Sequence, residues 1–196
     1  MEKKLAVGAI IKDGLDIGMK NAVPILVNTL LCILKIWIPY LNIGTTIGMV
    51  VGIVSKASKG ETISMTEIFN PAYRKYMGEF FLTSGLVSMG VFAGLIFFII
   101  PGCVIAIAWS LALLLAVDKE KNPMEAISFS NKVTYGNKLT IFLAQLVLMV
   151  ISGVVGFIFL KIPAIGWLLY LAVILLTVFV GIGMQAYIYK TLCADS

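Results

Sequence analysis

Long apolar stretches separated by short charged segments dominate this sequence. A membrane-spanning helix needs roughly 20 apolar residues, with a range of about 17–25; four stretches meet this requirement clearly, and the second and fourth in chain order are shorter or weaker. Each of these two begins just after a proline-containing corner and ends at charged residues, so we interpret both as the returning arms of helical hairpins. The six expected spans are Ala22–Ile38, Leu41–Val54, Phe80–Ile100, Cys103–Val117, Leu139–Leu160 and Ala164–Ile188. The pattern predicts an all-α polytopic membrane protein with six transmembrane helices in three hairpins.

The corners of the three hairpins recur at a fixed interval. Each corner is an Ile-Pro pair, and 62 residues separate Pro39 from Pro101 and again Pro101 from Pro163. Self-similarity at a fixed period is the signature of a repeat architecture. We expect each proline in the first turn of a return helix, where its missing N–H costs little. The alternative is that three unrelated hairpins share these Ile-Pro corners by chance.

Helix-start signals precede two of the hairpins. Ser64 and Glu67 have the spacing of a capping box, and Asn122 is followed by Pro123 and Glu125 in a similar pattern. The predicted repeat is a short amphipathic inner helix, an outward span, a proline corner and a return span. The chain would form a single membrane domain, 1–196, with pseudo-repeats of about 1–59, 60–120 and 121–196. Units with two spans each share one orientation, which implies a pseudo-threefold axis along the membrane normal.

Composition and charge support a membrane protein and orient it. Hydrophobic residues make up 60% of the chain and charged residues only 13%, against about 25% charged in soluble domains, so a soluble globular protein is excluded. With both termini cytoplasmic, 13 of the 15 basic residues fall in the inner segments, as the positive-inside rule requires. We expect a multi-pass protein of the plasma (inner) membrane. Its basic, aromatic-bearing inner segments suit anionic lipid headgroups rather than nucleic acid.

The residues that usually carry catalysis are missing or badly placed. The sequence has no histidine, no Asp or Glu inside an expected span, and three cysteines that do not form a metal-binding pattern. We therefore expect no enzyme activity, no catalytic residue, no metal site and no cofactor. Lys35 is the only ionisable residue within a span, and we expect its long side chain to reach the outer headgroups.

Patterned glycines and scattered amides are the remaining candidates. Small residues at every fourth position let helices approach closely. We expect these close contacts to form between helices of one chain; the alternative is an interface between copies of the chain. The candidate packing glycines are Gly44, Gly48, Gly52, Gly90 and Gly94. Asn28, Ser88 and Gln145 would face one polar cavity if the protein transports a solute.

A longer motif surrounds the second corner. Its residues are Pro101, Gly102, Ala126, Ser130 and Gly136. This pattern resembles the membrane domain of glycerophosphodiester phosphodiesterases and the related YciC-like uncharacterised bacterial six-span membrane proteins. The resemblance covers roughly residues 60–160. It implies a plasma-membrane domain without catalytic machinery of its own, since hydrolysis in those enzymes belongs to a separate soluble domain, which we do not expect here.

Two hypotheses for function follow from these observations. The first is a non-enzymatic membrane module whose inner helices engage membrane lipids or a protein partner, with a homo-oligomer as one possibility. The second is a channel or facilitator for a small neutral or amphiphilic solute.

Overall fold

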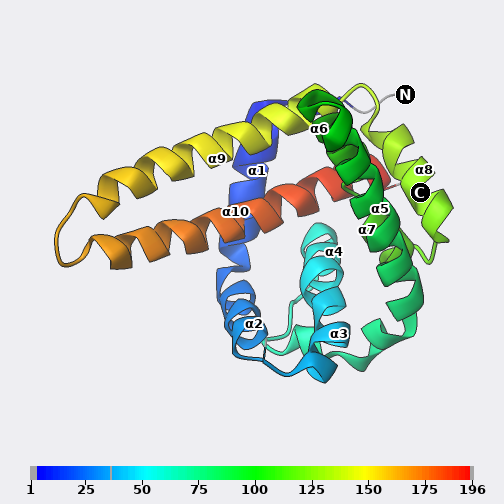
Figure 1. Ribbon diagram of the computed structural model, residues 1–196. Helices are drawn as coiled ribbons and strands as arrows, with labels where there is room; N and C mark the ends of the chain where they lie inside the picture. The colour runs from blue at the N-terminus through cyan, green and yellow to red at the C-terminus, as the bar shows by residue number, and fades with distance from the viewer. Residues whose placement is uncertain (1–3, 36, 195–196) are drawn as a thin grey trace.

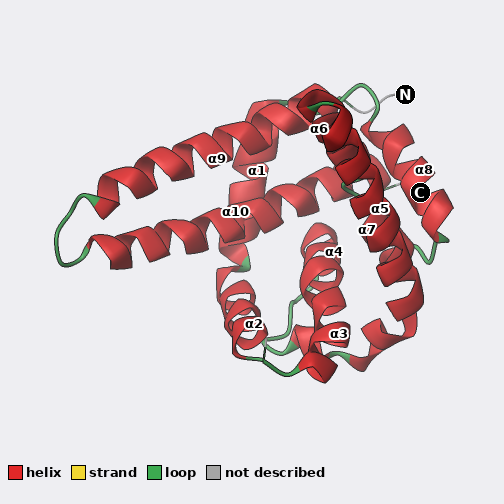
Figure 2. Ribbon diagram, in the orientation of Figure 1, coloured by secondary structure: helices red, strands yellow, loops and turns green. Residues whose placement is uncertain are grey.

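A computed structural model describes residues 4–35 and 37–194 of the chain, and within these ranges it contains helices, turns and loops but no strand (Figures 1 and 2). The first third holds α1 (Val7–Lys20), α2 (Ala22–Leu34), α3 (Pro39–Ile47), the π-helical segment η1 (Gly48–Gly52) and α4 (Ile53–Lys59). The middle third holds η2 (Glu67–Phe69), η3 (Pro71–Tyr76), α5 (Met77–Phe97), α6 (Ile99–Ala108) and α7 (Ala112–Asp118). The last third holds α8 (Pro123–Thr134), α9 (Lys138–Leu160) and α10 (Gly166–Cys193).

Four helices are long and apolar enough to cross a membrane. They are Pro71–Phe97, Ile99–Asp118, Lys138–Leu160 and Gly166–Cys193. A fifth is possible if α1 and α2, which meet at an angle of 75°, together form one bent span. The protein is therefore an all-helical chain with four to five candidate membrane-spanning helices, consistent with an integral membrane protein. The expected span Leu41–Val54 lies in α3–η1–α4, which is not among the four.

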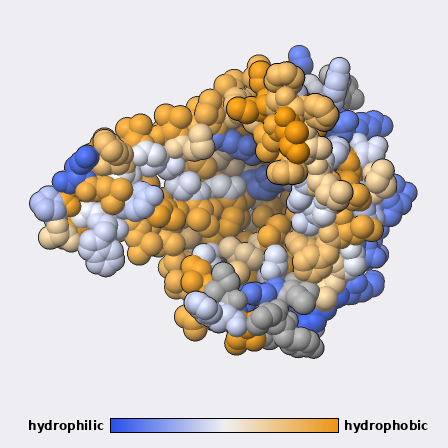
Figure 3. All heavy atoms as spheres, viewed as in Figure 1, coloured by the Kyte–Doolittle hydropathy of each residue, from blue (hydrophilic) through white to orange (hydrophobic). Residues whose placement is uncertain are grey.

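The helices that follow the three corners lie deeper in the molecule than the helices that precede the second and third corners. We call α3–η1–α4, α6–α7 and α10 the return helices. Only 17% of the most apolar stretch is buried in the outgoing helices α5 and α9, against 44% in Ile99–Asp118 and 28% in α10. Figure 3 shows hydrophobic residues over most of the α9–α10 hairpin and hydrophilic ones along the opposite side of this view. Such broad exposed apolar faces suit contact with lipid.

Glycines allow α1 to cross α10 at very short range (Figure 1). An added Cβ at Gly183 would lie 1.9 Å from the carbonyl oxygen of Gly14, and one at Gly18 would lie 2.2 Å from the carbonyl oxygen of Phe179. No side chain larger than hydrogen fits at these positions without moving a helix. The contact joins the first and last thirds of the chain.

The glycines expected to pack helices lie against other parts of the same chain. Added Cβ atoms at Gly44, Gly48 and Gly52 would meet the side chain of Arg74, the backbone of Ile68 and the ring of Tyr73. This face is thus covered by the segment that leads into α5.

The other two candidate glycines lie in the α5–α6 hairpin. Gly90 faces the ring of Trp109, and Gly94 faces the backbone of Gly102. Gly102 allows the two arms of the hairpin to meet next to the corner.

The second return helix is broken between α6 and α7, and α8 and α10 supply partners for the freed backbone groups. The Ser130 hydroxyl donates to the carbonyl oxygen of Ala108 at 2.7 Å and accepts from the amide of Leu111 at 3.2 Å. The amide nitrogen of Gln185 donates to the carbonyl oxygen of Ser110 at 3.0 Å. An interrupted helix is tolerated at membrane depth where other protein groups satisfy its backbone. Ser130 therefore has a clear structural role.

The other residues of the motif around the second corner also have local structural roles. Pro101 lies in the first turn of α6, Ala126 is fully buried, and Gly136 adopts a φ of 78° in the turn before α9. A left-handed backbone of this kind favours glycine.

The expected corner geometry is confirmed at Pro39, the first residue of α3, and at Pro101. It is wrong at Pro163, which precedes α10 by three residues in a turn where Ala164 has a φ of 68°. The predicted helix start at Asn122 is confirmed, because the Asn122 side chain accepts from the Glu125 amide at 2.9 Å.

Candidate functional site

A largely buried carboxylate joins the C-terminal ends of the three return helices. Asp118, the last residue of α7, accepts hydrogen bonds from Ser55 and Lys59 of α4, both at 2.5 Å, and from the Tyr189 hydroxyl of α10 at 2.7 Å. Its side chain is only 9% exposed. We call Ser55, Lys59, Asp118 and Tyr189 the return-helix junction. A carboxylate with this many charged and polar donors is strongly held in its ionised form.

A second buried carboxylate, Glu67, fixes the segment between α4 and α5. Burial by itself would raise the pKa of Glu67, but hydrogen bonds from Lys56, Tyr73, Asn70 and the Ser64 amide outweigh burial and hold the pKa below its usual value. The Lys56 ammonium lies 2.8 Å from the carboxylate and the Tyr73 hydroxyl 2.7 Å.

Asn28 of α2 holds the same segment from the other side. Its amide nitrogen donates to the carbonyl oxygen of Ser64 at 2.8 Å, and its amide oxygen accepts from the Ile68 amide at 3.0 Å. The helix predicted from Ser64 onward is therefore replaced by the short 3₁₀ turns η2 and η3, packed against α2 and α3. The capping-box glutamate does reach back to the Ser64 amide, at 3.3 Å, but it also binds Lys56, which no local pattern indicated.

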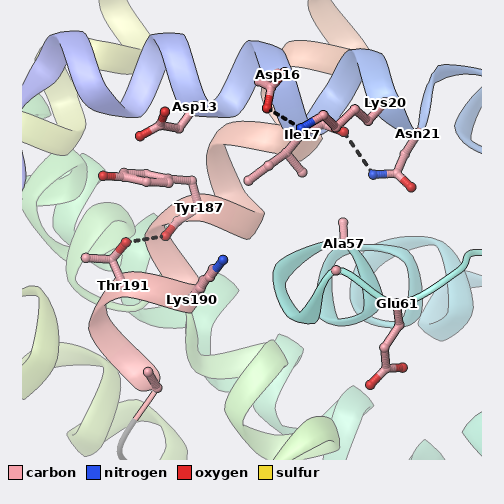
Figure 4. A pocket seen from close by; sticks show the side chains of 12 residues that line it. Asp13, Asp16, Ile17, Lys20, Asn21, Ala57, Glu61, Tyr187, Lys190 and Thr191 are labelled. Carbon is pink, nitrogen blue, oxygen red and sulfur yellow. Dashed lines mark hydrogen bonds and ion pairs between the residues drawn. The ribbon is translucent and has the colours of Figure 1, made fainter.

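A cleft of about 740 Å³ opens between α1, α4 and α10, close to the return-helix junction (Figure 4). We call it the charged cleft, because five of its lining residues carry charge. The charged residues are Asp13, Asp16, Lys20, Glu61 and Lys190. The three carboxylates and two ammonium groups give a net charge of −1.

The charges of the cleft are distributed over its walls. On α1, Asp16 and Lys20 form an exposed ion pair at 2.7 Å. Figure 4 shows Asp13 of α1 facing Tyr187 of α10, and the Lys190 side chain standing between α10 and α4. The cleft can therefore offer both a carboxylate and an ammonium group to a bound molecule. Among residues 4–35 and 37–194, no group of three His, Cys, Asp or Glu side chains is placed to hold a metal ion.

The charged cleft was not found by the sequence interpretation, although part of its pattern is visible there. Asp13, Asp16 and Lys20 are spaced by three and four residues, which puts them on one face of a helix. The contributions of α4 and α10 depend on contacts between distant parts of the chain, which a single sequence does not show.

The three amide and hydroxyl residues expected to converge make their contacts in different places. Asn28 is fully buried against Ser64 and Ile68, whereas Ser88 is exposed on α5. Gln145 lines a groove between α9 and α10 together with Gln185.

Lys35 differs from expectation. Its side chain is only 5% exposed, and its Nζ has no hydrogen-bond partner within the described part of the protein. The prediction that it reaches the outer headgroups is wrong for this conformation, since such a lysine would keep its ammonium exposed.

Comparison of the chain with protein-family models, with curated proteins and with solved structures gave no match. The resemblance to the membrane domain of glycerophosphodiester phosphodiesterases stays a prediction. The function must therefore be argued from the geometry of the charged cleft and its surroundings.

Proposed function

We propose that the protein is a non-enzymatic integral membrane module that binds phospholipid headgroups in the charged cleft. The cleft itself is the observation that supports this proposal. It is a cavity of about 740 Å³ with charges of both signs, bordered by helices with exposed apolar side chains. Small-molecule sites usually measure about 300–1,000 Å³. Leu15 and Met19, one turn apart on α1, are both exposed beside the cleft residues of that helix, and they offer a surface for acyl chains.

The orientation that we propose places the cleft in the cytoplasm-facing headgroup region of the plasma (inner) membrane, with both termini cytoplasmic. The distribution of basic residues along the chain supports this orientation.

We further propose six spans in three parallel pseudo-repeats. The order of elements supports this, because each third of the chain runs from a short helix or turn through an apolar helix and a corner to a return helix. Superposition of the three units would test the repeat.

Retention of lipid by the purified full chain tests the proposed function. We expect at least one phospholipid per chain to remain after extensive washing in mild detergent, measured by native mass spectrometry. A protein partner at fixed stoichiometry without bound lipid would favour the partner-binding alternative. A bare, monodisperse chain would contradict the proposal.

A second candidate function is facilitated passage of a small neutral or amphiphilic solute. The groove between α9 and α10 favours it, because Gln145, Ser152, Thr177 and Gln185 place polar groups along an otherwise apolar hairpin. Flux into liposomes across a panel of solutes would test this function, and flux equal to that of empty vesicles would exclude it for the panel.

A further inference from the structure

A second pocket adjoins the charged cleft and carries the opposite charge. It measures about 310 Å³ and shares Lys190 and Ala194 with the cleft. Its charged lining residues are Lys59, Asp118, Lys119 and Lys190. Three lysines against one carboxylate give a net charge of +2, and we call this space the lysine pocket.

Lys59 pairs with the one carboxylate of the lysine pocket, so the positive charge that the pocket offers to a ligand comes from Lys190, which lines both spaces. Asp118 accepts from Ser55, Lys59 and Tyr189 within the return-helix junction, so it is held on the protein side of the pocket. The C-terminal ends of the helices that terminate here carry partial negative charge, and the lysines offset it. This reduces the attraction of the lysines for an anion. The pocket is therefore suited to one phosphate group that is held further by a second contact, rather than to a highly charged anion.

The charged cleft supplies that second contact. Its net charge of −1 disfavours a headgroup that carries only negative charge, and its Asp16 is already paired with Lys20. Asp13 has no such ion pair on α1 and faces the cleft beside Tyr187 (Figure 4). Among the cations of phospholipid headgroups, a primary ammonium suits a carboxylate in this position better than a quaternary ammonium, since it combines charge with N–H donors.

We propose that the two pockets together bind a phosphate ester that carries a primary ammonium, with the ammonium at Asp13 and the phosphate at Lys190. A lipid of the phosphatidylethanolamine type has this chemistry, and so does a soluble phosphoethanolamine. The proposal rests on the proposed function where the ligand is a lipid, because it names which headgroup the cleft selects. Lys190, which lines both spaces, is the residue that links the two contacts.

Competition between lipids tests the proposal on the full chain. Delipidated protein in detergent is mixed with equal amounts of short-chain phosphatidylethanolamine, phosphatidylglycerol and phosphatidylcholine, and bound lipid is read by native mass spectrometry. We expect phosphatidylethanolamine to be retained roughly tenfold more than either competitor, because only its headgroup can donate a charge-assisted hydrogen bond from a primary ammonium to Asp13. Equal retention of the three lipids, or preference for phosphatidylglycerol, would overturn this inference but leave lipid binding intact.

Two variants locate the contacts. Asp13→Asn should lower phosphatidylethanolamine retention roughly tenfold and leave phosphatidylglycerol retention unchanged or higher, whereas Lys190→Gln should lower retention of both. Glu125→Gln is the matched control for Asp13→Asn, because it removes one exposed carboxylate on α8 outside both pockets. Unchanged retention in both cleft variants would overturn the assignment even if the lipid preference holds.

A soluble probe separates the two sources of the ligand. Displacement of phosphatidylethanolamine by millimolar O-phosphoethanolamine would show that the headgroup chemistry alone is bound. Binding of O-phosphoethanolamine without retention of any lipid would support the inferred ligand chemistry and contradict the proposed function. Failure of both probes would overturn both proposals.

Discussion

The α9–α10 hairpin and the return-helix junction are both built from apolar helices, yet they are held together in different ways. Along the hairpin, large side chains such as Phe157 and Leu168 are exposed, and the two arms extend away from the other helices (Figure 1). At the junction, one buried carboxylate takes hydrogen bonds from two other return helices. Apolar character alone therefore does not distinguish the exposed hairpin from the packed part of this chain, whereas the buried polar contacts occur in the packed part.

The largest expected effect comes from removing the carboxylate at the junction. Asp118→Ala should destabilise the protein by about 2–4 kcal/mol, because the Ser55 and Tyr189 hydroxyls lose their acceptor and a buried group left without a partner costs about 1–3 kcal/mol. Thermal unfolding in detergent measures the change. The matched control is Asp16→Ala, which breaks an exposed ion pair and should cost under about 1 kcal/mol. Equal effects of the two variants would remove the contrast between the largely buried carboxylate and the exposed ion pair.

A smaller effect should follow from filling a glycine contact. Gly183→Ala should cost about 1–3 kcal/mol, since the added methyl group meets the α1 backbone. Gly181→Ala on the same helix has open space around its Cβ and should be neutral or stabilise by up to about 1 kcal/mol. The same unfolding assay serves for both, and a costly Gly181→Ala would show that the exposed side of α10 is packed after all.

Lys35 allows a test in which loss of a charge should stabilise the protein. Its ammonium is buried without a hydrogen-bond partner in the described part of the chain, which is costly. Lys35→Met keeps much of the volume and should raise the free energy of unfolding by about 1–2 kcal/mol. Lys12→Met, at an exposed position of α1, is the control and should change little. A destabilised Lys35→Met would indicate that the ammonium has a partner.

The smallest effect should be the pH dependence that Glu67 adds. Its pKa is below the ordinary value of 4.5 in the folded protein, so its stabilising contribution is present at neutral pH and is lost as the pH falls through the lowered pKa. Wild type should therefore exceed Glu67→Gln in stability at pH 7, and the difference should shrink below roughly pH 4. A difference independent of pH would contradict ionic binding to Lys56.

The sequence predicts the parts of this fold that depend on local pattern. The long apolar helices, the corners at Pro39 and Pro101 and the start of α8 at Asn122 all follow from periodicity and capping rules. The charged cleft, the junction at Asp118 and the burial of Glu67 do not, because the cleft brings α1, α4 and α10 together, and Lys56 and Tyr189 lie 11 and 71 residues from the carboxylates that they bind. Glu67 looked like an ordinary capping residue, and only its tertiary contact with Lys56 reveals its burial.

Orientation in the membrane needs a reporter other than the native thiols. Cys193 is buried, so its lack of reaction with maleimide would not show on which side of the membrane it lies. Lys132 on α8 and Lys161 at the far end of α9 are both exposed, and they lie before and after the full length of that helix.

Labelling of single cysteines at these two positions, in a background without native cysteines, tests the proposed placement most directly. Intact cells are treated with a membrane-impermeant maleimide and compared with permeabilised cells. We predict that Lys161→Cys is labelled in intact cells and that Lys132→Cys is labelled only after permeabilisation. Labelling of both positions in intact cells, or of Lys132→Cys alone, would contradict a charged cleft that faces the cytoplasm from a membrane-spanning α9.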